Sequence, residues 1–201
     1  MTISPALLPS EISIDTLCIA TRLALPSGVA VMFRPLLPED SQLLGDYFQS
    51  LSAETRQRFG PHPLDRSTAD QLCATLNYAE VLRLIVVTTD QVIAYFILQL
   101  SVTEHEQRRY AERGLSLDPA TDCTCAPCVA DAYQAQGVGS AVMPLVVDVA
   151  RRLGRRWLVL LGGTQASNQR ALHFYRKHGF QTVGTFEYPA GILNEDMRLA
   201  L

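Results

Sequence analysis

The stretch QAQGVGS, residues 134–140, joins a strand-like run to a helical pattern and carries two glycines one residue apart. The apolar run APCVA (126–130) precedes it, and AVMPLVVDVARRLG (141–154) follows it with apolar residues at helical spacing. The first turn of a helix has backbone N–H groups without partners and a partial positive charge, so an anion is stabilised there. Glycine lets a phosphate approach the backbone closely. The stretch therefore predicts a pyrophosphate-binding turn, with Gly137 and Gly139 closest to the anion and the Ser140 hydroxyl beside it.

Other sites built on closely spaced glycines fit this stretch less well. A tight strand-to-helix turn that binds nothing is the simplest interpretation of Gly137 and Gly139 taken alone. The phosphate loop of nucleotide hydrolases needs Gly-Lys-Ser/Thr, and no lysine follows these glycines. The dinucleotide fingerprint needs a third glycine where this chain has Val142, and an acidic residue after the next strand, where it has Gly162 and Gly163.

Composition and charge describe an ordinary globular chain. Of the 201 residues, 48% are hydrophobic and 18% are charged, which suits one domain with its own core. The formal net charge is −3, so no nucleic-acid partner is expected, and the arginines at 151, 152, 155 and 156 are explained by the end of a helix.

The chain shows no sign of a membrane or of secretion. It contains no run of about 18 apolar residues, and its first 15 residues lack the positive start of a signal peptide. An odd number of cysteines without a secretion signal indicates a reducing compartment, so we expect a cytoplasmic protein. The five cysteines are Cys18, Cys73, Cys123, Cys125 and Cys128.

Strand-like and helical patterns divide the chain into an N-terminal arm, 1–15, and a single domain, 16–201. Strands are expected within 16–25, 29–36, 82–88, 91–102, 123–130 and 157–161, and two more after 180, joined by a Pro-Ala-Gly turn. Helices are expected over 40–51, from 67 onward, and over 141–154 and 167–178. Residues 104–120 are polar and suggest an irregular surface segment. This order predicts one α/β sheet with helices on both faces.

A second motif, SNQRALHFYRKHGF (167–180), places unlike side chains on one helical face. Asn168, Ala171, Leu172 and Tyr175 lie three, four and seven residues apart. The face combines an amide, small or apolar residues and a phenol. A half-buried aromatic with a solvated hydroxyl would explain Tyr175 if it stood alone.

Together, the two motifs resemble the GCN5-related N-acetyltransferase (GNAT) superfamily, and RPLLPED (34–40) resembles its first strand and turn. The resemblance implies a mixed, mostly antiparallel sheet with a splayed parallel strand pair and helices on both faces. It implies an N-acetyltransferase that uses acetyl-CoA (coenzyme A) as cosubstrate, without a metal, and acetylates a small-molecule or peptide amine. A homodimer is left open.

The resemblance also implies roles for individual residues. Backbone groups around Cys128, Val129 and Asp131 would contact the pantetheine arm, and Asn168 and Ala171 would lie along it. The Val129 N–H would stabilise the oxyanion, and Tyr175 would protonate the leaving thiolate. The pyrophosphate would be held by the loop residues Gln134, Ala135, Gln136, Gly137, Val138, Gly139 and Ser140.

One departure from the family pattern concerns the catalytic base. Fourteen residues before Gly137, where many members carry a carboxylate base, this chain has Cys123, and strand alternation turns the adjacent Asp122 to the other face. Other bases, a water chain or a neutral acceptor remain open; the alternative side chains are Glu104, His105, Glu187 and Glu195.

Three further interpretations stay open at this point. The cysteines at 123, 125 and 128 suggest a metal cluster, but small apolar filling of the core is favoured. Arginines at 56, 58, 108 and 109 could bind an acidic acceptor, although solvated surface charge explains them. The alternatives to an enzyme of this class are a non-catalytic acyl-CoA-binding sensor and a nicotinamide-dependent enzyme.

Overall fold

The computed structural model describes residues 6–201, and within them a nine-stranded sheet forms the centre of the molecule. Its order is β1-β2-β3-β4-β5-β6-β9-β7, with β8 paired to β9. Every pair is antiparallel except β5 and β6. The strands are β1 (Thr21–Ala24), β2 (Ala30–Pro35), β3 (Val81–Val87), β4 (Val92–Gln99), β5 (Cys123–Val129), β6 (Trp157–Leu160), β7 (Thr164–Gln165), β8 (Gln181–Glu187) and β9 (Leu193–Ala200).

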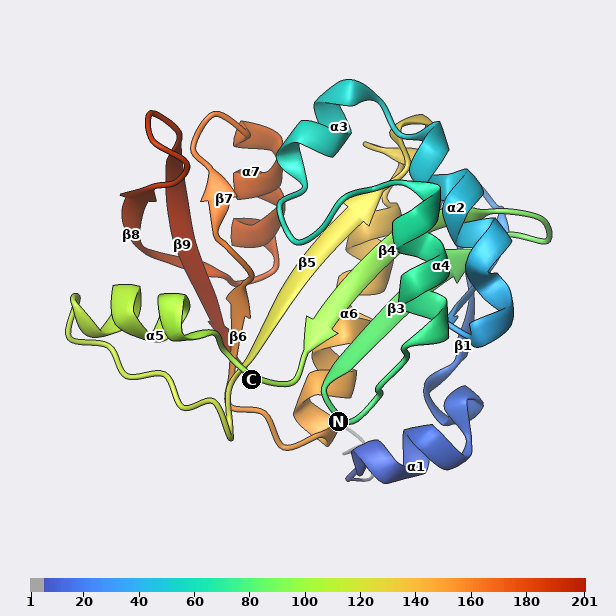
Figure 1. The fold of residues 1–201 in the computed structure, drawn as a ribbon, viewed down its shortest axis with the longest axis horizontal. Helices are drawn as coiled ribbons and strands as arrows, with labels where there is room; N and C mark the ends of the chain where they lie inside the picture. Colours follow the sequence, from blue (N-terminus) through green and yellow to red (C-terminus); the bar gives the residue numbers. More distant parts are fainter. Residues whose placement is uncertain (1–5) are drawn as a thin grey trace.

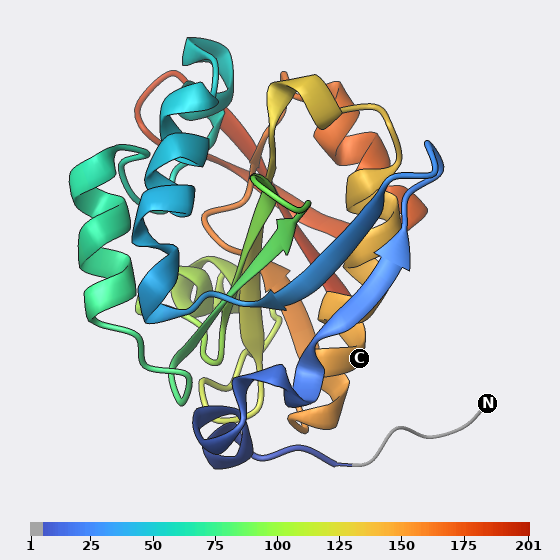
Figure 2. The ribbon, with the colours of Figure 1, turned by 90° about the vertical axis from the view of Figure 1, so that its right-hand side faces the viewer.

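Helices cover both faces of this sheet. Helices α2 and α4 lie on one face, α6 and α7 on the other, and α5 lies beside β6 and β9 (Figures 1 and 2). The α-helices are α1 (Pro9–Ile14), α2 (Ser41–Ser50), α3 (Ala53–Arg58), α4 (Arg66–Ala74), α5 (Glu104–Ala111), α6 (Val138–Arg152) and α7 (Gln169–Lys177). Short 3₁₀ turns are η1 (Thr16–Ile19), η2 (Pro38–Asp40) and η3 (Asp131–Tyr133). The predicted fold class is confirmed.

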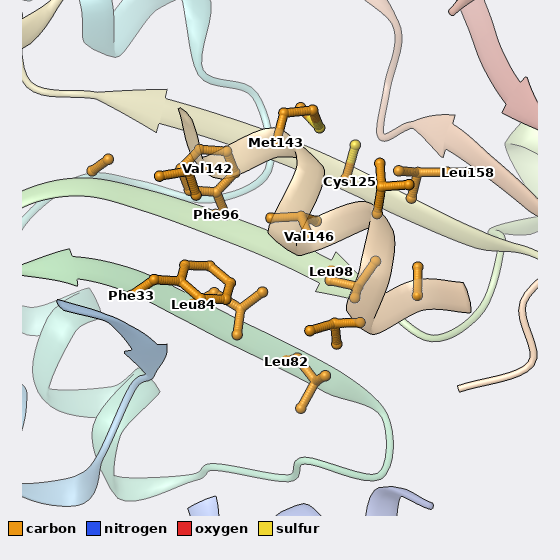
Figure 3. Close-up of a cluster of buried hydrophobic side chains, with 14 of the residues drawn as sticks. Phe33, Leu82, Leu84, Phe96, Leu98, Cys125, Val142, Met143, Val146 and Leu158 are labelled. Carbon is orange, nitrogen blue, oxygen red and sulfur yellow. The ribbon is translucent and has the colours of Figure 1, made fainter. Parts of the chain in front are cut away.

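Side-chain alternation along β4 divides the core into two layers. Phe96 and Leu98 belong to the layer under α6, while Tyr95 and Ile97 belong to the layer under α2 and α4. Figure 3 shows the first layer, in which Val142 and Met143 of α6 and Cys125 of β5 gather above the strands. A strand buried on both faces explains why this segment is apolar at almost every position.

The segment 104–120 differs from the sequence expectation of an irregular surface excursion, which was wrong. It contains α5, which begins with a capping box: Thr103 accepts from the Glu106 N–H, and the Glu106 carboxylate accepts from the Thr103 N–H at 2.9 Å. Tyr110 is fully buried and donates to the Met197 carbonyl at 3.1 Å. A mostly polar helix was missed because its few inward side chains make ion pairs and hydrogen bonds instead of an apolar stripe.

The N-terminal segment contacts the domain from residue 7 onward. Leu7 and Ile12 are buried in the α6-side core, and the Leu7 N–H donates to the Arg152 carbonyl at 2.9 Å. The first part of the predicted arm, residues 1–5, lies outside the described residues. No helix among the described residues has the length and apolar character needed to cross a membrane.

Candidate acyl-CoA site

The parallel strands β5 and β6 pair over only three residues and then separate. Their register runs from Cys123 with Leu158 to Cys125 with Leu160, and the Leu161 N–H donates to the Cys125 carbonyl at 2.9 Å. Beyond this bond the chain after β6 bends away toward β7, so that the two segments form a V (Figure 1). Gly162 and Gly163 both have φ of +71°, a left-handed conformation that glycine adopts without strain. One edge of β5 is therefore left without a partner strand.

Hydrogen-bond directions show which backbone groups of β5 face this open edge. The Ala130 N–H donates to Ile93 of the β4 side at 2.9 Å, and successive residues of a strand point their N–H groups to opposite edges. The N–H and C=O of Val129 therefore face the gap. The Gln134 side chain confirms the direction, because its Nε2 donates to the Val129 carbonyl at 2.9 Å.

The glycine loop continues from this strand into α6. Gly137 is the N-cap residue and has φ of +84°, so the turn itself needs a glycine. A Cβ on Gly137 would lie 2.9 Å from Pro26 Cγ, and one on Gly139 would lie 3.1 Å from Phe174 Cε2. A larger residue at either position would therefore crowd a neighbouring side chain of the protein, whether or not a ligand binds.

The first turn of α6 presents backbone donors that suit an anion. Residues 138–140 open a helix of 15 residues, and the N–H groups of a first turn have no acceptor inside the helix. The N-cap glycine has no side chain that could accept from them. Donors of this kind fit a diphosphate, and the macrodipole adds a favourable field.

Helix α7 brings two cations against the loop that sequence reasoning did not assign to the site. Lys177 Nζ lies 3.5 Å from the Ser140 hydroxyl, and an Arg170 guanidinium nitrogen donates to the Gln134 side-chain oxygen. Residues 170 and 177 are seven apart, so they lie on one face of α7 two turns apart. The spacing of these two residues could be read from the sequence. That they face the glycine loop and the start of α6 could not.

Tyr175 lies on the same helix and is buried among aromatic rings. Its ring centroid is 5.3 Å from that of Phe174 and 5.4 Å from that of Phe180. Burial raises the pKa of the phenol well above its usual value, the nearby Cys125 adds to the shift, and a hydrogen bond with Thr164 opposes it. The phenol therefore stays protonated at physiological pH.

Three other predicted site residues have structural partners. The Asn168 side-chain oxygen caps α7 by accepting from the Ala171 N–H at 3.1 Å, which leaves its amide nitrogen as the possible donor to a ligand. The Asp131 carboxylate accepts from the Ser52 N–H at 2.8 Å and from the Thr55 hydroxyl at 2.7 Å. Asp131 thus ties the start of α3 to the end of β5.

The cysteines of β5 do not provide a base. Cys123 is fully buried and donates to the Trp157 carbonyl at 3.4 Å, and burial raises its pKa to about 12. Burial also raises the pKa of Cys128 to about 11 and that of Cys125 further. All three are therefore thiols at neutral pH. Within residues 6–201, no group of three or more His, Cys, Asp or Glu side chains is arranged to hold a metal ion.

The alternative base candidates from the sequence are scattered. Glu104 and His105 are exposed on α5, and Glu187 is exposed at the end of β8. The Glu195 carboxylate on β9 is occupied by Arg176 at 2.8 Å and by Thr182 at 2.9 Å.

Sequence reasoning missed a polar cluster on the α2/α4 face of the sheet. His62 lies in the loop between α3 and α4, which passes over β5 (Figure 1). Its Nδ1 is 2.7 Å from the Pro63 carbonyl, and its Nε2 is 3.2 Å from the Tyr95 hydroxyl. The Tyr95 hydroxyl oxygen accepts from Arg83 at 3.2 Å. Burial lowers the pKa of His62 below 6.5, so the ring is neutral at pH 7. Both ring nitrogens already have partners, so we assign this cluster a structural role.

A mostly antiparallel sheet whose one parallel pair splays open beside a glycine-led helix is the fold of a GCN5-related N-acetyltransferase. The model of the acetyltransferase (GNAT) family matches residues 46–180. The chain therefore belongs to the GNAT family, whose members in general transfer acyl groups from acyl-CoA to amines.

Solved structures share this fold at low sequence identity. The GNAT domain of S. lividans PAT is 18% identical with a TM-score of 0.70, and the match covers 91% of this chain and 97% of that one. A GCN5-related N-acetyltransferase from Kribbella flavida is 19% identical with a TM-score of 0.63, covering 85% and 98%. Mycobacterium smegmatis RimJ in complex with CoA-disulfide is 11% identical with a TM-score of 0.67, covering 90% and 86%. No curated protein matches the sequence.

Proposed function

We propose that this protein is an acetyl-CoA-dependent N-acyltransferase that moves an acetyl group to an amine by direct attack. The observation that carries the proposal is the open edge of β5, where the Val129 N–H faces the gap. The first turn of α6 follows this strand, and the phenol of Tyr175 on α7 interacts with Thr164 of β7 and Cys125 of β5. These groups come from three separate segments of the chain, and each suits a different part of the same thioester cosubstrate.

The loop and α7 would hold the diphosphate end. Backbone N–H groups of residues 135–140 would donate to the anion, whereas the Gln134 N–H donates to the Asp131 carbonyl at 3.3 Å. The Ser140 hydroxyl would add a donor and Lys177 positive charge. The pantetheine arm would then run along β5 toward Val129, with the Asn168 amide nitrogen and Ala171 beside it. Gln134 now donates to the Val129 carbonyl, so an amide of the arm would replace that bond with an equivalent one.

Val129 and Tyr175 would act on the reacting thioester. When a neutral amine attacks the carbonyl carbon, the carbonyl oxygen gains negative charge, and a fixed N–H from Val129 stabilises it. As the tetrahedral species collapses, the C–S bond breaks and the thiolate takes the proton of the Tyr175 hydroxyl. The attacking nitrogen loses a proton to water as the amide forms, and the tyrosinate regains a proton from water. Burial raises the pKa of Tyr175, so the phenol carries its proton at neutral pH.

No side chain is proposed as the base. The position that would carry a carboxylate is Cys123, which is buried and protonated. The acceptor amine would therefore arrive neutral or lose its proton to water. The acceptor itself is proposed only as a small-molecule or peptide amine.

The buried Cys123 at the position of the family's carboxylate favours a second candidate, a non-catalytic acyl-CoA-binding sensor. A chain that lacks the carboxylate could keep the cosubstrate cleft and lose turnover. The two candidates share binding and differ in chemistry.

One experiment separates these candidates and tests the proposal. Calorimetric titration with acetyl-CoA, CoA and NAD would be followed by measurement of thiol release with a panel of amino acids, polyamines, aminoglycosides and peptide N-termini. Binding of acetyl-CoA with amine-dependent thiol release supports the enzyme. Binding without release for any amine supports the sensor, and binding of NAD but not of CoA would refute both.

A further inference from the structure

A proline lies in the middle of β5, a position that strands rarely tolerate. Pro127 pairs with Phe96 of β4 in the register of the sheet. Because proline has no N–H, it is accommodated only where that side of the strand has no partner. By strand alternation, the Pro127 nitrogen points to the same edge as the carbonyl of Cys125 and the N–H of Val129, which is the edge facing β6.

The parallel ladder ends at the bond that Pro127 cannot make. The pairing of Cys125 with Leu160 would continue to Pro127 and Gly162, and its next bond would run from the nitrogen of residue 127 to the Leu161 carbonyl. That nitrogen has no hydrogen to donate. The bond after it would run from the Gly163 N–H to the Pro127 carbonyl, but Gly163 donates to Leu160 at 3.1 Å instead.

The diverging strand is held from its other side by α5. The Gly162 N–H donates to Glu106 Oε1 at 3.0 Å, and Glu106 is only 2% exposed. Helix α5 and the turn after it are in turn fixed to β9, because Arg109 of α5 and Arg113 of the turn pair with the fully buried Asp196 at 3.0 and 2.8 Å. The bond to Glu106 holds Gly162 in place, since breaking it leaves Oε1 of the buried Glu106 carboxylate with only the 3.8 Å ion pair to Arg109.

We propose that Pro127 is a positioning residue that keeps β5 and β6 apart, with Glu106 anchoring the opposite strand. The missing N–H prevents the two strands from closing over the space that the pantetheine arm would use. It also leaves Val129 as the residue of β5 that can donate to an acyl carbonyl in the gap, because Ala126 and Cys128 point their N–H groups toward β4. This inference rests on the proposed function in taking acyl-CoA as the ligand.

The test restores the missing N–H with Pro127→Ala and compares it with two controls. In the first, residue 127 is introduced as lactic acid, so that the alanine side chain is kept and an ester oxygen replaces the N–H. In the second, Pro119→Ala changes an exposed proline in the loop before β5. Each protein is measured for thermal stability, for CoA affinity by calorimetry and, for Pro127→Ala, for hydrogen exchange at amide 127.

We expect Pro127→Ala to bind CoA about tenfold more weakly, while its melting temperature stays equal or rises because the ladder gains a bond. Amide 127 should be protected from exchange. The lactic acid variant should bind CoA like the native protein, and so should Pro119→Ala. A proline needed only for stability would lower melting temperature and affinity together.

Two results would overturn the proposal: an unprotected amide 127, or unchanged CoA affinity in Pro127→Ala. If the native protein does not bind CoA at all, the proposed function fails, while exchange at amide 127 still decides whether the proline holds the strands apart.

Discussion

The hydroxyl of Tyr47 on α2 donates a hydrogen bond of 2.8 Å to the carbonyl oxygen of Cys128 on β5. The two residues are 81 positions apart in the chain, and both are buried. The bond joins the α2/α4 layer to the strand residue directly before Val129. The open edge of β5 is therefore supported from the face opposite to α6.

Removing this hydroxyl should destabilise the protein. We expect Tyr47→Phe to lower the free energy of unfolding by about 1 kcal/mol, the usual net value of such a bond. Urea denaturation measures the change. Tyr188→Phe is the matched control because Tyr188 is 74% exposed. Equal stability of the two variants would show that the Tyr47 bond is not formed in solution.

Tyr175→Phe should impair chemistry more than binding. The ring keeps its contacts with Phe174 and Phe180, but the thiolate loses its proton donor. We expect kcat to fall by about 100-fold or more, with the KM for acetyl-CoA nearly unchanged. Steady-state thiol release gives both values. A kcat within about twofold of the native value would remove Tyr175 from the proposed mechanism.

The pH dependence of kcat/KM should follow the pKa of the acceptor amine and not that of a group on the enzyme. Cys123 has a pKa raised to about 12 by burial, and burial also raises the pKa of Tyr175, so neither loses its proton between about pH 6 and 9. Since an amine attacks only when neutral, kcat/KM should rise with pH up to the pKa of the amine. Two acceptors with different pKa values should give two different midpoints. A common midpoint would instead reveal a base on the enzyme.

The phosphate loop is better tested at Lys177 than at its glycines. Gly137→Val would strain a residue at φ +84° and clash with Pro26 even without a ligand. We expect Lys177→Gln to raise the Kd for CoA about three- to tenfold at low salt, and less at high salt, because a charge contact is screened. Arg151→Gln, an exposed change at the other end of α6, is the control. Equal effects of the two changes would mean that Lys177 acts only through net charge.

The ion cluster under α5 should be essential for stability. Asp196 is fully buried between Arg109 and Arg113, so Asp196→Ala leaves two guanidinium groups without their carboxylate. We expect a loss of about 3–5 kcal/mol, against about 0.5 kcal/mol or less for Glu54→Ala, which removes an exposed pair with Arg58 on α3. Denaturant titration compares them. Similar losses of stability in Asp196→Ala and Glu54→Ala would mean that Asp196 and its two arginines are exposed to solvent.

Local sequence patterns were sufficient to predict the fold class and the position of the glycine loop before α6. Helix α6 and the strand before it follow from apolar spacing, and Gly137 marks the start of the helix as expected. Helix α5 was missed because Glu106 and Arg109 turn inward to polar partners, a preference that depends on residues far along the chain. The contacts of Lys177 and His62 and the position of Pro127 at the open edge of β5 were not foreseen for the same reason: each depends on a neighbour supplied by another segment.

The sequence by itself determined the class of fold and the glycine turn at the start of α6, because helix starts, strand periods and glycine turns are set by residues a few positions apart. Only the tertiary structure decided which backbone groups remain free. Whether an N–H on β5 faces a partner or a gap depends on where β6 leaves the sheet. The pairing of β5 with β6 ends at Cys125 and Leu160, and the Gly162 N–H then donates to Glu106 on α5. Hydrogen-bond satisfaction is a property of the assembled neighbours, so no single segment could reveal it.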